Sequence, residues 1–267
     1  MHTSLLRPFS ASVAALLATG LFIAGCTSAP RAVIDPALLD PAKNSAVRPA
    51  PRDANWVKRH EGFVDIARKG GVDVLFLGDS ITDAWRSESA RGGKKVWDRE
   101  FAPLHAANFG ISGDRTQHVL WRLQNGESDG IQPKAVVLMI GTNNTGFETD
   151  KVTPRNTPAE TVAGVATIVN TLRTKFPRAK IMLLAVFPRG EKPDHPQRLQ
   201  VNEINRGLVG LADGKTVRHL DIGPKFLQPD GTLPKDIMPD FLHPGAAGYE
   251  IWAAAIKQPL LDMLRGS

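Results

Sequence analysis

Val72-Asp73-Val74-Leu75-Phe76-Leu77-Gly78-Asp79-Ser80 is the stretch of sequence that decides the fold. Its apolar part, 72–77, is short and rich in β-branched and aliphatic residues, which predicts a buried β-strand. A glycine, an aspartate and a serine follow directly, where that strand ends. Taken alone, Ser80 is most simply an N-cap residue of a helix, so any further role depends on its surroundings.

Other apolar runs along the chain have the same character, and amphipathic stretches separate them. The predicted strands are 72–77, 105–109, 135–140, 180–187 and 217–221, and the predicted helices are 116–124, 158–176, 199–211 and 246–264. Strands that alternate with helices pair in parallel through right-handed crossovers. The sequence therefore predicts one α/β domain, a three-layer α/β/α sandwich around a five-stranded parallel sheet.

Polar segments follow several of these strands. They are Gly78-Asp79-Ser80, residues 110–114, residues 141–144 and the loop Asp240-Phe241-Leu242-His243. In an open parallel sheet, ligands bind at the carboxyl ends of the strands. We therefore expect these segments to meet at one edge of the sheet.

An acid three residues before a histidine gives Ser80 the partners that a nucleophile needs. A serine hydroxyl becomes reactive when an imidazole takes its proton and a carboxylate orients that imidazole. In a turn, the Asp240 carboxylate can reach back to Nδ1 of His243 and leave Nε2 for the serine. The predicted catalytic residues are Ser80, Asp240 and His243.

A tetrahedral intermediate also needs hydrogen-bond donors for its oxyanion. The predicted donors are the backbone amides of Ser80 and Gly113 and the side-chain amide of Asn143. Gly113 could instead be a simple turn residue, and Asn143 could bond its own backbone. The order of all these segments at successive strand ends favours the catalytic interpretation. Asp114 and Arg115 are expected to form a structural ion pair beside them.

Other sites fit the sequence poorly. The serine segment lacks the second glycine of a G-x-S-x-G elbow, and Gly214-Lys215-Thr216 has Val209 where a phosphate loop needs glycine. The histidines lack metal-ligand spacing, so neither a metal nor a cofactor is expected. The net charge of +6 comes from 33 basic and 27 acidic residues that are interspersed, which argues against a nucleic-acid partner.

The chain resembles the SGNH, or GDSL, hydrolases, and within them the catalytic subunits of intracellular platelet-activating factor acetylhydrolases. The resemblance covers residues 72–256 and rests on Asn108-Phe109-Gly110-Ile111, His118-Val119-Leu120-Trp121-Arg122-Leu123, Gly141-Thr142-Asn143-Asn144 and Asp240-Phe241-Leu242-His243. It implies a flavodoxin-like fold, with Ser80, Gly113, Asn143 and His243 as the family's four residues and Asp240 as the acid. It also implies pairing as a homodimer. Ser112 and Pro244 depart from the subfamily pattern.

The substrate expectation is a serine esterase for short acyl groups. Ile81, Thr142 and Leu242 neighbour the predicted catalytic residues and are bulky enough to shorten an acyl pocket, which favours acetyl esters. The alcohol would be an acetylated carbohydrate, or alternatively a small lipid-like ester. A third hypothesis is an inactive, surface-tethered binding module.

The N-terminus predicts export and anchoring. Residues 1–25, with Arg7 ahead of an apolar stretch, are typical of a signal peptide, and Ile23-Ala24-Gly25-Cys26 resembles a lipobox in which Cys26 is lipidated. We expect residues 26–52 to be a lipidated, proline-rich tether and residues 53–267 to be the hydrolase domain. The expected location is the outer membrane, facing the periplasm or the cell surface. Cys26 could instead lie beside a conventional cleavage site.

Overall fold

The structure is a computed structural model that describes residues 1–2, 34–89 and 92–266. The predicted signal peptide and the predicted lipidation of Cys26 therefore lie outside the described residues, apart from the first two positions. Among the described residues, no helix combines the length and the apolar character that crossing a bilayer requires.

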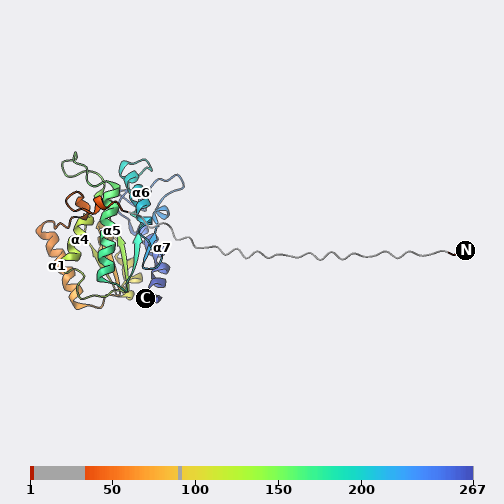
Figure 1. The fold of residues 1–267 in the computed structure, drawn as a ribbon, viewed down its shortest axis with the longest axis horizontal. Coiled ribbons are helices and arrows are strands. Elements are labelled where there is room, and N and C mark those ends of the chain that lie inside the picture. Colours follow the sequence, from red (N-terminus) through yellow and green to blue (C-terminus); the bar gives the residue numbers. More distant parts are fainter. Residues whose placement is uncertain (3–33, 90–91, 267) are drawn as a thin grey trace.

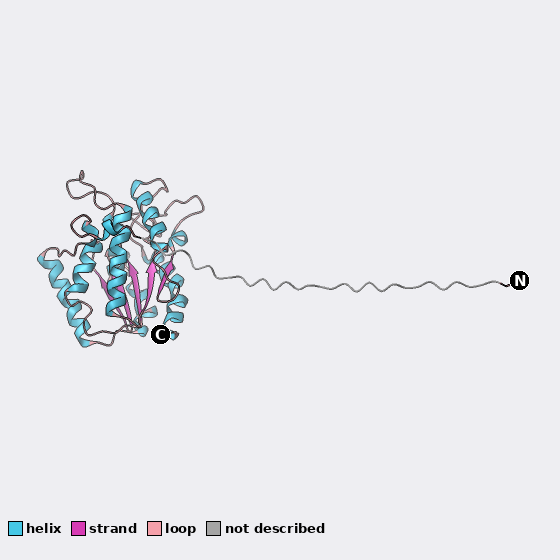
Figure 2. Cartoon of the chain, viewed as in Figure 1, coloured by secondary structure: helices cyan, strands magenta, loops and turns pink. Residues whose placement is uncertain are grey.

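A five-stranded parallel sheet forms the middle of the domain, with the strand order β2-β1-β3-β4-β5. The strands are β1 (Val74–Gly78), β2 (Ala106–Gly110), β3 (Ala135–Met139), β4 (Lys180–Leu184) and β5 (Val217–Leu220). All arrows point to one end of the molecule (Figure 2). Gly78 pairs with Gly110 on β2 and Met139 on β3, so the ends of the three strands are level. The predicted α/β fold is confirmed.

Helices cover both faces of this sheet, and α4 and α5 lie in front of the strands in Figure 1. The long helices are α1 (Ala54–Lys69), α4 (Thr116–Gln124), α5 (Pro158–Lys175), α6 (Pro196–Val209) and α7 (Ala246–Arg265), and the short α-helices are α2 (Ser80–Asp83) and α3 (Lys94–Glu100). The sequence did not predict α1, α2 or α3. It placed the other helices within a few residues of their observed bounds.

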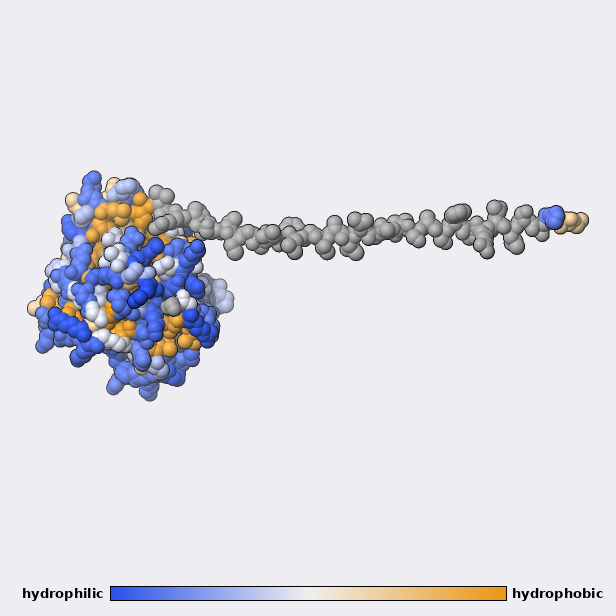
Figure 3. Space-filling model, turned by 60° about the horizontal axis from the view of Figure 1, so that its bottom comes forward, coloured by the Kyte–Doolittle hydropathy of each residue, from blue (hydrophilic) through white to orange (hydrophobic). Residues whose placement is uncertain are grey.

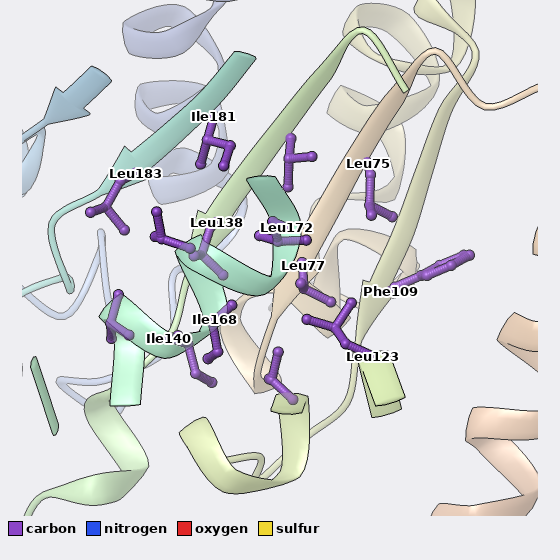
Figure 4. Packing of buried hydrophobic residues seen from close by; sticks show 14 of the residues in the cluster. Leu75, Leu77, Phe109, Leu123, Leu138, Ile140, Ile168, Leu172, Ile181 and Leu183 are labelled. Carbon is purple, nitrogen blue, oxygen red and sulfur yellow. The ribbon is translucent and has the colours of Figure 1, made fainter. Parts of the chain in front are cut away.

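The strands divide the core into two clusters because successive side chains of a strand point to opposite faces. In β1, Leu75 and Leu77 join an aliphatic cluster with α4, α5 and α6 (Figure 4). Val74 and Phe76 join a second cluster that holds Trp85 and Trp252 and is rich in aromatic rings. Hydrophilic residues cover most of the face seen in Figure 3, between separate hydrophobic patches.

Residues 34–53, which we call the N-terminal arm, pack against the domain. The arm contains two 3₁₀ turns, η1 (Pro36–Leu39) and η2 (Ser45–Val47). Ala46 is fully buried, and its carbonyl accepts a hydrogen bond of 2.8 Å from the Thr116 hydroxyl on α4. The Asn44 side-chain amide donates to the carbonyl of Glu160 on α5. The prediction of a tether over residues 34–52 is therefore wrong, because η2 and its N-cap residue bond to α4 and α5, and η2 buries Ala46 and Val47.

Candidate active site

Ser80 is held at the turn between β1 and α2. Asp79 caps α2 through a 3.0 Å hydrogen bond that its side chain accepts from the amide of Ile81. A Cβ on Gly78 would lie 2.5 Å from the Met139 carbonyl, and one on Gly110 would lie 2.4 Å from the Asp83 amide nitrogen. Because only glycine fits at both positions, the turn that carries Ser80 packs directly against β2 and β3.

His243 joins Ser80 to Asp240, as the sequence predicted for these three side chains. Its Nε2 lies 2.9 Å from the Ser80 hydroxyl oxygen, and its Nδ1 lies 2.9 Å from Oδ2 of Asp240. The other carboxylate oxygen of Asp240 accepts hydrogen bonds from the amides of His243, at 2.8 Å, and Leu242, at 3.1 Å. The carboxylate thus fixes both the loop and the imidazole ring. This is the geometry that activates a serine hydroxyl.

The charge on Asp240 is maintained by the same contacts. Partial burial favours the neutral acid, but the hydrogen bonds from the amide and ring of His243 outweigh it, so the pKa of Asp240 lies below its usual range. An ionised carboxylate keeps a proton on Nδ1 and leaves Nε2 able to accept the serine proton.

The candidate oxyanion donors lie on two loops that contact each other. Gly113 has a φ of +81°, a conformation that favours glycine. The Asn143 side-chain amide donates a 3.0 Å hydrogen bond to the carbonyl of Asp114. That bond uses one hydrogen of the amide nitrogen and leaves the second for another acceptor. The two loops that carry the predicted oxyanion donors Gly113 and Asn143 are therefore joined by a hydrogen bond.

Buried charges hold the Gly113 loop in place. Arg122 of α4 is fully buried, with its Nε 3.0 Å from Asp114 and its Nη1 2.6 Å from Glu127. The Trp56 indole donates a 2.6 Å hydrogen bond to Asp114. Arg52 of the N-terminal arm donates to the Ser112 carbonyl at 2.7 Å. The predicted partner of Asp114 was wrong, because Arg115 pairs instead with Glu148 on the outer loop 145–157.

The sequence reasoning missed Arg52 and Trp56 as supports of this loop. Arg52 lies 62 positions, and Trp56 lies 58 positions, from the aspartate that they contact. Nothing in the local pattern marks either residue. Only Arg122 had a signal, since it falls in a segment on which the family resemblance rests.

A cavity of about 520 Å³ opens beside the serine. Nine of its ten lining residues have polar or charged side chains; the ten are Arg59, Ser80, Asp83, Ala84, Arg86, Ser87, Ser89, Ser112, Asp240 and His243. The predicted acyl-pocket residues Ile81, Thr142 and Leu242 do not line it. Ile81 and Thr142 are each 1% exposed. Ile81 and Leu242 pack into or against the aromatic-rich cluster, and the Thr142 hydroxyl accepts a hydrogen bond from Arg189.

Two other histidines, His118 and His60, have structural contacts. His118 Nδ1 accepts a 3.0 Å hydrogen bond from the Arg115 amide, and burial beside several arginines lowers the pKa of His118 to about 3. His60 lies between Glu127 and the Asn125 carbonyl. Within residues 34–89 and 92–266, no group of three or more His, Cys, Asp or Glu side chains is arranged to hold a metal ion.

The chain matches known proteins in both sequence and fold. Residues 76–251 match the model of the GDSL-like Lipase/Acylhydrolase family. Platelet-activating factor acetylhydrolase IB subunit alpha2 from Rattus norvegicus is 39% identical over 213 residues, which cover 79% of this chain and 84% of the relative.

Two solved structures share the fold at lower sequence identity. A GDSL-like lipase from Bacteroides thetaiotaomicron has a TM-score of 0.60 at 20% identity, and the match covers 77% of this chain and 97% of the lipase chain. An acetylxylan esterase from Geobacillus stearothermophilus has a TM-score of 0.55 at 21% identity, and the match covers 73% of this chain and 94% of that protein's chain.

The fold, the serine at the end of β1 and these matches define a carboxylic ester hydrolase. Specifically, the chain belongs to the GDSL-like lipase/acylhydrolase family.

Proposed function

We propose that this protein hydrolyses acetyl esters through an acyl-enzyme formed on Ser80. One observation carries the proposal: the His243 ring lies 2.9 Å from both the Ser80 hydroxyl and the Asp240 carboxylate. This distance allows direct proton transfer from the hydroxyl to Nε2, and the carboxylate stabilises the imidazolium that results.

The reaction proceeds in two displacements. The Ser80 oxygen attacks the ester carbon while His243 takes its proton, and the amides of Ser80, Gly113 and Asn143 stabilise the oxyanion. His243 then protonates the leaving alkoxide. Water, deprotonated by the same imidazole, releases the acid and restores the serine.

Acetyl is the proposed acyl group. The names of the alpha2 subunit and of the Geobacillus enzyme both describe acetyl-ester hydrolases, although the likeness to the second protein concerns the fold alone. Rates on 4-nitrophenyl acetate, butyrate and palmitate test this, and a palmitate optimum would contradict it.

For the alcohol we propose an acetylated carbohydrate. Nine of the ten residues that line the cavity beside Ser80 have polar or charged side chains, which can form hydrogen bonds with a hydroxylated alcohol. A lipid-like ester is the second candidate, because the relative reported above is named for platelet-activating factor. Acetate release from acetylated xylan, compared with release from an acetylated glycerolipid, separates the two.

Ser80→Ala tests the mechanism. We expect turnover of 4-nitrophenyl acetate to fall at least about a thousandfold, and labelling by a fluorophosphonate to disappear, with an unchanged melting temperature. A Ser87→Ala variant, altered in the same cavity, should still be labelled. Undiminished hydrolysis by Ser80→Ala would refute the mechanism, and an unlabelled wild-type protein would favour the inactive binding module.

We also propose that the protein is exported, lipidated on Cys26 and anchored at the outer membrane, facing the periplasm or the cell surface. The supporting observation is the lipobox-like Ile23-Ala24-Gly25-Cys26 after an apolar stretch. Incorporation of labelled palmitate into the wild type but not into Cys26→Ser tests it.

Pairing as a homodimer is proposed from the family resemblance, and light scattering tests it.

A further inference from the structure

A cluster of charges lies in the wall of the cavity beside Ser80. Arg59 of α1 bonds Asp83 with both terminal nitrogens, each at 2.8 Å, and Arg86 bonds the same carboxylate at 2.6 Å. The Ser112 amide donates to it at 3.0 Å. We call Arg59, Asp83 and Arg86 the arginine cluster. Its formal charge is positive, because two guanidinium groups share one carboxylate.

The arginine cluster offers donors to a ligand rather than acceptors. Both oxygens of Asp83 already accept hydrogen bonds from Arg59, and Arg86 and Ser112 add one each. A carboxylate so fully engaged is a poor partner for the hydroxyl hydrogens of a sugar. The contacts of Asp83 with Arg59 and Arg86 also outweigh its burial and keep its pKa below the usual range, so it stays ionised.

Arg59 and Arg86 differ in what they can still bind. Arg86 donates to the carbonyl oxygens of Asn108 and Gly110 at the end of β2, so its donors are directed into the domain. The Arg59 side chain is 42% exposed, and its hydrogen bonds to Asp83 use only part of the donor set of a guanidinium. Arg59 is therefore the residue that can contact a ligand, while Arg86 holds Asp83 in position.

We infer that the arginine cluster is a subsite for an anionic group, a carboxylate or a phosphate, on the alcohol part of the ester. Arg59 and Ser80 line one cavity, so the alcohol part of an ester bound at the serine has a guanidinium group in the wall of the same cavity. Charge-assisted hydrogen bonds from arginine to an oxyacid are stronger than those to a neutral oxygen. This inference rests on the proposed function and narrows it from acetylated alcohols in general to negatively charged ones.

The test compares esters that differ in charge but hardly in size. The substrates are 3-acetoxybenzoate, 3-acetoxyphenyl phosphate and the neutral 3-acetoxybenzamide, and the variants are Arg59→Gln and Arg59→Lys. We expect Arg59→Gln to lower the ratio of kcat/KM for the anionic esters to kcat/KM for the amide by about tenfold, mostly through KM. Arg59→Lys should be intermediate, because it keeps the charge but loses the planar fork.

Arg68→Gln is the matched control, because Arg68 lies on the same helix, is exposed and does not line the cavity. It should leave all three rates unchanged. Raising NaCl from low to high concentration should weaken the anionic preference of the wild type and have little effect on that of Arg59→Gln. A preference for the carboxylate or for the phosphate identifies the kind of oxyacid.

An equal ratio in the wild type and Arg59→Gln, with both proteins folded and active on the amide, would overturn the subsite. Failure of the proposed function would give a different result, since Ser80→Ala would then hydrolyse every ester at the wild-type rate.

Discussion

The loops on the two sides of Ser80 are stabilised in different ways. On the proton-transfer side, Asp240 and His243 bond each other within four residues, and their side chains are 36% and 30% exposed. On the oxyanion side, the Gly113 loop depends on Asp114 and Arg122, whose side chains are fully buried. The first loop is built from local contacts and the second from contacts between distant segments. Chemistry and stability are therefore separable on the first side and coupled on the second.

Asp240→Asn gives the largest expected effect on the chemistry alone. The amide oxygen of asparagine can still accept the backbone hydrogen bonds of residues 242 and 243, so the loop should persist. Without the carboxylate charge, kcat on an acetate ester should fall by roughly four orders of magnitude. The midpoint of urea unfolding should stay at the wild-type value. A large loss of stability would show that this loop is not independent of the core.

Arg122→Met should instead destabilise the Gly113 loop and lower the free energy of unfolding of the protein. The change leaves Asp114 and Glu127 buried without their shared counter-charge, which typically costs about 3–5 kcal/mol. Urea unfolding measures the loss. Arg265→Gln removes an exposed ion pair with Asp262 and serves as the control, with an expected change below about 1 kcal/mol. Equal effects of the two substitutions would contradict the coupling of stability to the oxyanion side.

Asp79→Asn should give the smallest effect, and one that depends on pH. Burial raises the pKa of Asp79 to about 7 from the model-compound value of 3.8. The folded protein then holds a proton that the unfolded chain has lost, so folded stability decreases as pH rises from about 4 to about 7. Asparagine preserves the bond to the Ile81 amide and does not ionise. Between pH 5 and pH 8 the wild type should lose a few degrees of melting temperature relative to the variant. Melting temperatures of the wild type and the variant that change equally with pH would argue against this ionisation of Asp79.

The difference between local contacts and contacts between distant segments also bears on what could be predicted from the sequence. The parallel sheet follows from strand periodicity and the contact of Asp240 with His243 from their short spacing, and the structure has both. The contact of His243 with Ser80 joins segments 163 positions apart, and it was predicted because polar segments that follow parallel strands meet at one edge of the sheet. The strand predicted to end at Phe187 ends at Leu184, because its neighbour β5 ends at Leu220 and offers no further pairing.

Contacts between distant segments that no sequence motif marks could not be predicted. No local pattern links Arg59 to Asp83, or the N-terminal arm to α4 and α5. The side chains of Ile81 and Thr142 lie inside the domain rather than along the cavity, since packing against other elements determines where they point.

Packing of the N-terminal arm against the domain also limits the reach that the proposed lipid anchor on Cys26 would allow. With residues 34–52 fixed to the domain, only residues 27–33 separate the proposed lipid on Cys26 from the folded part. Even fully extended, those residues span no more than about 25 Å. With the proposed lipid on Cys26, the folded domain would therefore stay within this distance of the bilayer, and its substrates would have to lie at the bilayer surface or close to it.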